Sequence, residues 1–283
     1  DYTKAKEWFL KAARQNHAYA QFEMGELHYF GNGVFKDSVK AREWFIKAAE
    51  QGHGSAQCKV GYIYRRGHGV PQDYAKAKEW FLKAATTKHP AAQYALGDLY
   101  FYGHGVPEDN AEAKEWYIKA AGHRHVGAEY SLGVLYHQGL GVQKDYDEAK
   151  NWFIKAARQG LSLAQHSLGL LYQNGHGVPL DYSKAMGWFV KAADDEYASS
   201  QYETGDLYYY GQGVPKNYLK AKEWYLKAAK QGKAAAQYSL GILYRQGQGV
   251  PKDLQQAKTW YRKAAVQGHN HAALLAFLAI LEE

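Results

Sequence analysis

Histidine is the residue type in this sequence that most directly suggests chemistry, because eight of its thirteen copies recur at regular spacing. Members of one set are separated by multiples of 36 residues: His17, His53, His89, His125 and His269. A second set has the same spacing: His68, His104 and His176. Imidazole is a common zinc ligand, but zinc requires ligands about 2.1 Å from a single point. The elements that carry these histidines therefore decide whether a metal site is feasible.

A single period organises the whole sequence. All eight tryptophans are 36 residues apart: Trp8, Trp44, Trp80, Trp116, Trp152, Trp188, Trp224 and Trp260. A fixed period of this length is typical of repeat arrays. No insertion interrupts it, so the sequence predicts one array over 1–283 without a linker.

One helix in each period follows an Asp or Asn that lies seven residues before the tryptophan. The segment DYAKAKEWFLKAA, 73–85, is typical, and its Ala77, Trp80, Phe81 and Ala84 fall on one helical face. Asp and Asn are good N-caps because the side-chain oxygen accepts a hydrogen bond from a free N–H of the first turn. We name this helix B, and its expected caps are Asp1, Asp37, Asp73, Asp109, Asp145, Asp181, Asn217 and Asp253.

The second helix of each period, helix A, carries a glycine at its centre, as in HPAAQYALGDLYFYG, 89–103. Glycine inside a helix costs about 1 kcal/mol relative to alanine. We therefore expect a neighbouring helix to approach closely at this point, through the Trp or Tyr of helix B. The positions are Gly25, Gly61, Gly97, Gly133, Gly169, Gly205 and Gly241.

Short glycine-containing turns join the helices, which predicts antiparallel neighbours. One A/B pair cannot cover its own apolar face, whereas stacked pairs bury a continuous core. The sequence thus predicts an all-α fold, an α/α solenoid of 36-residue helix-turn-helix repeats. We expect a half repeat at the N-terminus, a terminal helix at 269–282, and seven A/B hairpins at 17–50, 53–86, 89–122, 125–158, 161–194, 197–230 and 233–266.

The recurring pattern A-x-A-Q-Y-x-L-G-x-L-Y, then G-x-G-V-P-x-D-Y and K-A-x-E-W-Y-x-K-A-A, resembles the Sel-one-like repeat family, a relative of the tetratricopeptide repeats. The resemblance covers nearly the whole chain, from Asp1 to about Ala273. It implies a right-handed superhelical scaffold or adaptor for a protein partner. The chain has only Cys58, so it departs from the family's cysteine-rich bacterial branch and has no intrachain disulfide.

Stacked repeats argue against catalytic and metal sites. Equivalent histidines then lie roughly 10 Å apart, one interhelical spacing, which is too far for shared zinc coordination. The GHGVP segment lacks the Lys-Ser/Thr of a phosphate loop, and the variable carboxylates lie in different repeats. We expect no metal, no cofactor and no enzymatic activity.

Four positions of helix A change from copy to copy, and their offsets of 3, 4 and 7 place them on one stripe. By resemblance to tetratricopeptide arrays, this stripe lines a concave groove. Acidic residues beside paired aromatic residues can hold a Lys or Arg of a bound peptide, and arginines in other copies offer the opposite charge. The expected contact residues are Glu26, Tyr29, Phe30, Tyr62, Arg65, Arg66, Asp98, Phe101, Tyr102, His137, Gln138, Asp206, Tyr209, Tyr210 and Arg245. The other interpretation is that these positions are solvated and weakly constrained.

Two further functions are compatible with the sequence. The formal charge of +7 and a ladder of helix B lysines suggest a nucleic-acid or polyanion binder. Aromatic grooves also stack on sugars, which suggests an envelope glycan-associated protein. The ladder consists of Lys11, Lys47, Lys83, Lys119, Lys155, Lys191, Lys227 and Lys263, and a Glu four residues earlier in several copies predicts ion pairs that keep this face hydrated.

The ends of the chain carry weaker signals. No stretch reaches the roughly 18 apolar residues of a spanning helix. The chain begins at Asp1 within a repeat, which suggests a fragment or a processed chain, and the compartment is not predicted. The apolar run AALLAFLAIL in the terminal helix predicts packing against a further helix or self-association with a second copy.

Overall fold

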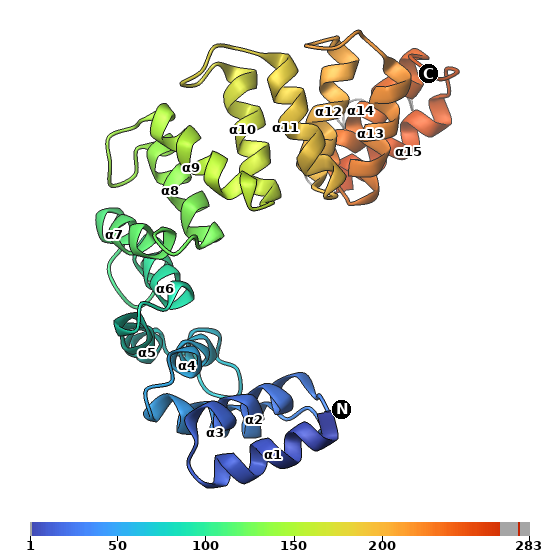
Figure 1. The fold of residues 1–283 in the computed structure, drawn as a ribbon. Coiled ribbons are helices and arrows are strands. Elements are labelled where there is room, and N and C mark those ends of the chain that lie inside the picture. Colours follow the sequence, from blue (N-terminus) through green and yellow to red (C-terminus); the bar gives the residue numbers. More distant parts are fainter. Residues whose placement is uncertain (1, 267–276, 278–283) are drawn as a thin grey trace. The chain divides into compact units, whose positions relative to one another are not determined.

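The structure, a computed structural model, describes residues 2–266 and Phe277, and every regular element in this part of the chain is an α-helix. The chain divides into two units, Asp1–Lys144 and Asp145–Glu283, which are described separately (Figure 1). Unit 1 contains α1 (Tyr2–Arg14), α2 (Ala18–Phe30), α3 (Ser38–Glu50), α4 (Gly54–Arg66), α5 (Tyr74–Thr86), α6 (Pro90–Phe101), α7 (Asn110–Ala121) and α8 (Val126–Gln138). Unit 2 contains α9 (Tyr146–Arg158), α10 (Ser162–Asn174), α11 (Tyr182–Asp194), α12 (Ala198–Tyr210), α13 (Tyr218–Lys230), α14 (Ala234–Gln246) and α15 (Leu254–Val266).

Within each unit, every helix packs against the next one along the chain, which confirms the expected all-α solenoid. The even-numbered helices are helix A and the odd-numbered helices are helix B of the repeats. In unit 1 the two sets lie on opposite sides of the stack (Figure 1). The predicted terminal helix 269–282, and with it the predicted self-association, lies outside the described residues. None of the described helices is long and apolar enough to cross a membrane.

The odd-numbered helices begin as predicted. The side chains of Asp37, Asp109 and Asp145 each accept hydrogen bonds from two backbone N–H groups in the first turn, at 2.9 to 3.1 Å. Asn217 caps α13 in the same way, through the N–H of Lys220. Removing such a cap typically costs about 1 kcal/mol. The cap expected at Asp1 lies outside the described residues.

The central glycine lies against an aromatic ring in α2, α4, α6, α10, α12 and α14, as expected. A methyl group added at Gly97 would lie 2.5 Å from the Tyr117 ring, which is closer than real side chains approach. The other glycine–aromatic pairs within a unit are Gly25–Phe45, Gly61–Phe81, Gly169–Phe189, Gly205–Tyr225 and Gly241–Tyr261. The expected partner was a Trp or Tyr, and the tryptophan part of that prediction is wrong.

The tryptophans instead pack backward onto the preceding helix pair. Trp44 of α3 lies on the buried cluster of Ala13, Ala20 and Met24 from α1 and α2. Consecutive residues of a helix point about 100° apart, so Trp44 and Phe45 contact different parts of that pair, and it is the Phe45 ring that lies beside Gly25 of α2.

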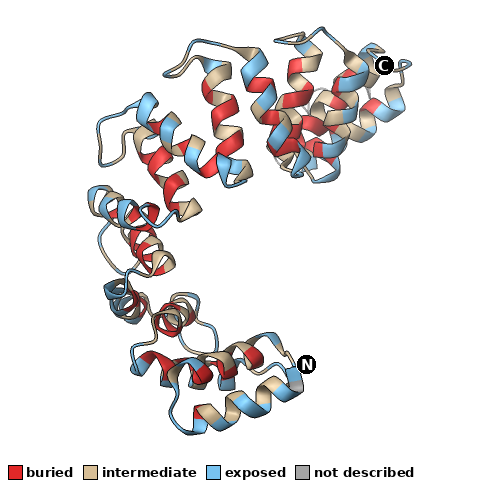
Figure 2. Cartoon of the chain, in the orientation of Figure 1, coloured by how far each residue is buried: buried red, intermediate tan, exposed pale blue. Residues whose placement is uncertain are grey.

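The core of each unit is narrow and rich in alanine. Buried residues line the facing sides of the paired helices, while exposed residues lie on their outer sides and in the connections (Figure 2). The largest fully buried side chains include Phe45, Phe81, Tyr117 and Tyr225. Alanine at most other core positions lets the backbones approach closely, so these rings supply much of the buried apolar area.

Candidate functional site

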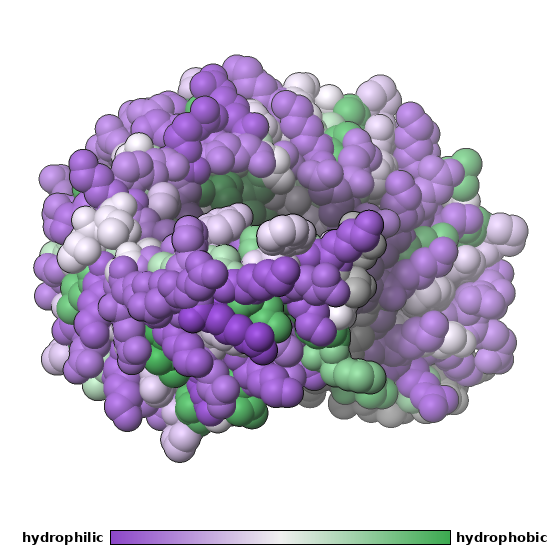
Figure 3. Space-filling model, turned by 60° about the horizontal axis from the view of Figure 1, so that its bottom comes forward, coloured by the Kyte–Doolittle hydropathy of each residue, from purple (hydrophilic) through white to green (hydrophobic). Residues whose placement is uncertain are grey.

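The predicted contact residues all lie on the even-numbered helices or, for Tyr102, at the end of one. We name the stripe formed by these residues the even-helix surface. Three of its aromatic side chains are well exposed: Phe30 (58%), Tyr102 (58%) and Tyr210 (60%). Figure 3 shows that hydrophilic residues cover most of one face of the molecule, with hydrophobic residues in small separate patches. Exposed rings in equivalent positions of three repeats therefore stand out against a polar surface.

Each exposed ring is held edge-on by the aromatic residue before it. The ring centroids of Tyr29 and Phe30 are 5.1 Å apart at an interplanar angle of 89°. The equivalent pairs, Phe101–Tyr102 and Tyr209–Tyr210, have nearly the same geometry, at 4.8 and 4.9 Å. In all three, a third ring from the next odd-numbered helix lies 6.5 Å from the first ring: Phe45, Tyr117 and Tyr225. The repeats thus build three aromatic clusters of matching design.

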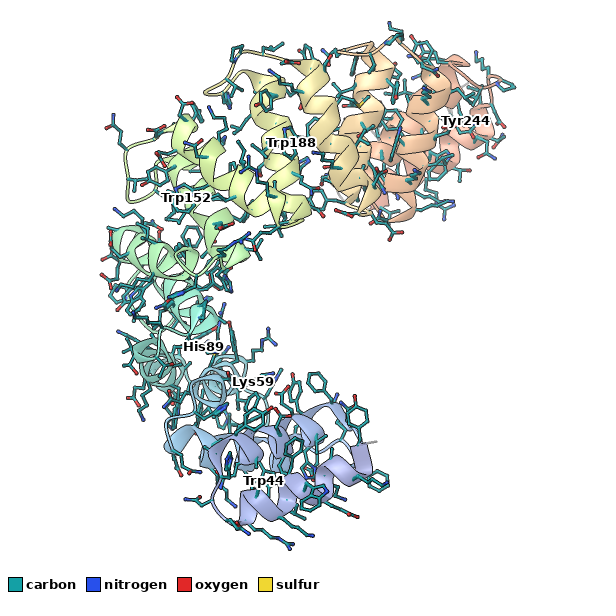
Figure 4. The ribbon with its side chains drawn as sticks, viewed as in Figure 1. Trp44, Lys59, His89, Trp152, Trp188 and Tyr244 are labelled. Carbon is teal, nitrogen blue, oxygen red and sulfur yellow. The ribbon has the colours of Figure 1, made fainter. Side chains whose placement is uncertain are left out.

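The carboxylate of the first cluster already holds a cation from the chain itself. The Lys59 ammonium lies 3.0 Å from Glu26, and its Nζ is 5.3 Å from the Tyr29 ring centroid and 5.8 Å from that of Phe30 (Figure 4). Acid and paired rings hold a lysine here, as the sequence suggested, but the lysine comes from the next repeat. The sequence analysis did not identify Lys59, although its column is one of the four variable ones.

The carboxylate of the second cluster also has an internal partner. Asp98 is buried, and both guanidinium nitrogens of Arg65 reach its Oδ2, at 3.2 and 3.3 Å. The Tyr117 hydroxyl donates to its Oδ1 at 3.1 Å. Burial raises the pKa of Asp98, while Arg65 opposes that rise. Asp98 and Arg65 thus neutralise each other instead of presenting two separate open charges.

The third cluster contains two carboxylates. The Tyr225 hydroxyl donates a 2.6 Å hydrogen bond to Asp206, and the side chain of Gln173 donates a weak one to Glu203 at 3.4 Å. Burial raises the pKa of Asp206. Burial and the nearby Asp206 charge raise the pKa of Glu203. Glu203 was not among the predicted contact residues, although it lies three residues before Asp206 and therefore on the same face of α12.

The remaining predicted residues are spread along the same surface. The Arg66 guanidinium lies 5.8 Å from the Tyr62 ring centroid. On α8, His137 is partly buried and Gln138 is exposed. Arg245 is partly buried on α14. The structure therefore brings the predicted residues onto a common helix set within each unit, but not into one pocket.

The lysine ladder on the odd-numbered helices differs from expectation. Every ladder lysine places its ammonium over the tryptophan three residues earlier, from 3.6 Å for Lys155–Trp152 to 4.9 Å for Lys11–Trp8. The expected pairs with a Glu four residues earlier are absent from the ion pairs between described residues. Cation–π contact with the broad indole face competes with a solvated carboxylate, whose ion pair contributes little.

Three histidines of the first set, His17, His53 and His125, cap helices, whereas His89 makes no side-chain cap hydrogen bond. The Nδ1 atoms of His53 and His125 each accept a hydrogen bond at 3.2 Å, from the N–H of Ala56 and of Ala128, and His17 does the same at 3.4 Å. An accepting Nδ1 requires a neutral ring. Burial lowers the pKa of His53 and His125 accordingly. In the described part of the chain, no three potential metal ligands converge.

Comparison with known proteins agrees with this architecture. The Sel1 repeat matches at residues 1–17, 18–53, 54–86, 90–124, 126–161, 162–197, 198–233 and 234–269. A protective antigen of uropathogenic Escherichia coli strains, which displays an SLR fold, is 38% identical with a TM-score of 0.88. That match covers 93% of this chain but only 56% of the antigen. No curated protein matches the chain.

A second solved structure, a Sel1 repeat protein from Oxalobacter formigenes, is 35% identical with a TM-score of 0.77. The match covers 95% of this chain and 77% of the Oxalobacter chain. Yeast Tom70 shares the fold at 16% identity with a TM-score of 0.52, and the match covers 99% of this chain and 58% of the Tom70 chain. Sel1 repeat proteins generally mediate protein–protein interactions. Because Sel1 repeats match almost the entire length of the chain, the chain belongs to the Sel1 repeat family.

Proposed function

We propose that this chain is an interaction scaffold that binds a partner polypeptide along its even-helix surface. The observation that carries the proposal is the repeated exposure of Phe30, Tyr102 and Tyr210 at one position of three even-numbered helices. Large rigid aromatic side chains lose little conformational entropy on binding, and they are enriched among the residues that dominate interface energies. The charged groups between them vary from repeat to repeat, which suits a partner with its own pattern of charge.

The odd-helix face supports this assignment by contrast. Its lysines lie over tryptophan rings in the same way in every repeat. A uniform face offers a partner no position-dependent features. Lysines held on rings are also less free to follow a phosphate backbone, which makes the polyanion-binding alternative the weaker one.

Peptides selected from a displayed random library on the intact chain test the proposal. The affinity of a selected peptide is measured by calorimetry for Phe30→Ala, Tyr102→Ala and Tyr210→Ala. We expect at least one substitution to weaken binding about tenfold or more, the effect of losing an interface hot spot. Phe35→Ala is the matched control, because Phe35 is 96% exposed but lies in the connection between α2 and α3.

Three outcomes would contradict the proposal. The first is a library that yields no binding peptide. The second is a set of selected peptides that bind all three surface variants as tightly as the unmodified chain. The third is preferential binding of oligonucleotides with a steep salt dependence, which would favour the lysine ladder.

A further inference from the structure

In the first two aromatic clusters the cation follows one register rule, since it lies 33 residues from its carboxylate in the sequence. Lys59, which pairs with Glu26, lies 33 residues after it in the sequence. Arg65, which pairs with Asp98, lies 33 residues before it. A carboxylate in this column is therefore reached from two sequence positions, one in the next repeat and one in the preceding repeat.

The third cluster has a neutral residue at both positions. Gln173 lies 33 residues before Asp206, and Ser239 lies 33 residues after it. Ser239 stands where the first cluster has Lys59. Its short hydroxymethyl side chain brings no ammonium group to the rings of the third cluster. Among the described residues, no ion pair joins a cation to Asp206 or Glu203.

Lys233, which acts on Glu203 electrostatically, does not take the missing role. The Lys233 Nζ bonds the Ser199 hydroxyl at 3.0 Å. Asp206 instead accepts hydrogen bonds from the uncharged hydroxyl groups of Tyr225 and Tyr202. The third cluster thus lacks the cation that each of the first two clusters has.

We propose that Glu203, Asp206, Tyr209 and Tyr210, backed by the Tyr225 ring, form a binding site for a lysine side chain of the partner polypeptide. The site rests on the proposed function, since the lysine arrives with a polypeptide on the even-helix surface. The first cluster shows how the site accepts its ligand: Lys59 lies between one carboxylate and three rings, including that of Phe45 at 6.0 Å. The Lys59 side chain stays partly exposed in the first cluster, and the Tyr210 ring of the third cluster is 60% exposed, so a ligand can reach this place from solvent.

The pKa shifts of the two carboxylates in the third cluster agree with this assignment. Burial raises the pKa of both Asp206 and Glu203, and the Asp206 charge raises that of Glu203 further. An arriving ammonium offsets the repulsion and the lost hydration together. The same cation gains cation–π contact with aromatic rings, as Lys59 does in the first cluster.

The smallest peptide unit with a lysine side chain, Nα-acetyl-lysine N-methylamide, serves as the probe. Tyrosine ring signals of the full chain, labelled with carbon-13 and assigned through Tyr209→Phe and Tyr210→Phe, are followed by NMR during titration. We expect the signals of Tyr209 and Tyr210 to shift saturably with a dissociation constant on the order of millimolar. The Nε-acetylated analogue, which keeps the four-carbon side chain but loses its positive charge, should cause no saturable shift.

The register rule supplies matched variants. Ser239→Lys should fill the site from within and abolish the shifts, whereas Ser239→Thr should leave them unchanged. Lys59→Ser should open the first cluster, so that the Tyr29 signal begins to respond to the probe. Circular dichroism of each variant checks that the helices are retained.

Equal shifts with both probes, no saturable shift at Tyr209 and Tyr210, or undiminished shifts in Ser239→Lys would each overturn the site. The outcome is separable from that of the peptide selection. A lysine site with no peptide binding would leave the proposed function wrong, and peptide binding that is indifferent to Ser239→Lys would leave the lysine site wrong.

Discussion

Tyr225 and Asp206 form the shortest side-chain link within the third aromatic cluster: the phenol donates to the carboxylate at 2.6 Å. The same tyrosine ring fills the space beside Gly205, so one side chain both packs the helix pair and satisfies a partly buried charge. In the first two repeats of unit 1, Phe45 and Phe81 do only the packing. The hydroxyl is therefore a local addition for the acidic residue and is not needed for the fold.

Tyr225→Phe should lower the free energy of unfolding by about 1–3 kcal/mol, because it removes a donor from a partly buried carboxylate and leaves the packing intact. Denaturant unfolding followed by circular dichroism measures the change. Tyr210→Phe, in which the removed hydroxyl belongs to an exposed ring, should stay within about 0.5 kcal/mol of the unmodified chain. Equal effects of the two substitutions would contradict the role given to the Tyr225–Asp206 bond.

Asp206→Asn should stabilise the chain at pH 7. The folded-state pKa of Asp206 lies above its ordinary value of 3.8, so folding disfavours the charged form, and this penalty grows as the pH rises through the folded-state pKa. The amide still accepts the Tyr225 hydrogen bond. Thermal unfolding at pH 7 should show a higher Tm for the variant, and the advantage should shrink as the pH approaches 3.8.

Asp98→Asn is the control for that prediction. The pKa of Asp98 is also raised, but Arg65 is its partner, and removing the carboxylate leaves the guanidinium without its ion pair. Because Arg65 offsets part of the cost of burying the Asp98 charge, we expect Asp98→Asn to stabilise the chain less than Asp206→Asn does at pH 7. Equal stabilisation by both substitutions would mean that the Arg65 ion pair contributes nothing.

Gly97→Ala should destabilise the chain by about 1–3 kcal/mol, because the added methyl group meets the Tyr117 ring at 2.5 Å. Gly187→Ala should change the free energy of unfolding in the opposite direction. Gly187 is an exposed interior residue of α11 with no atom near the added methyl group, so alanine should stabilise by about 0.5–1 kcal/mol through helix propensity. Urea unfolding of the two variants tests both, and a stabilising Gly97→Ala would disprove the steric account.

Acidification should weaken the histidine-capped helices. Burial lowers the folded-state pKa of His125 below its ordinary value of 6.5, so its contribution to stability is complete above that pH and is lost as the pH falls through the folded-state pKa. His125→Asn keeps a capping acceptor that does not titrate. Its Tm should match the unmodified chain at pH 8 and exceed it at pH 5, and an unchanged difference between these pH values would exclude a titrating cap.

The sequence predicted the helices and their order because the relevant signals are local. The N-caps at Asp37 and Asp109, the left-handed glycines after α2 and α4, and the 36-residue tryptophan period each depend on a few neighbouring residues. The same regularity predicted that the variable columns would share one helix set. It did not predict the partner of the central glycines, since Trp44 and Phe45 are both aromatic and only packing decides which ring faces Gly25.

What the sequence alone determined is the repeat: two capped helices, a glycine at a crowded crossing and a stripe of variable residues. What only the tertiary structure decided is how the charges of that stripe are matched. Glu26 and Asp98 look like equally open acids in the sequence, yet each holds a cation from a neighbouring repeat, while Asp206 does not. The physical reason is that a charge is neutralised by whatever lies within a few ångströms of it, and stacking brings residues 33 positions apart to that distance.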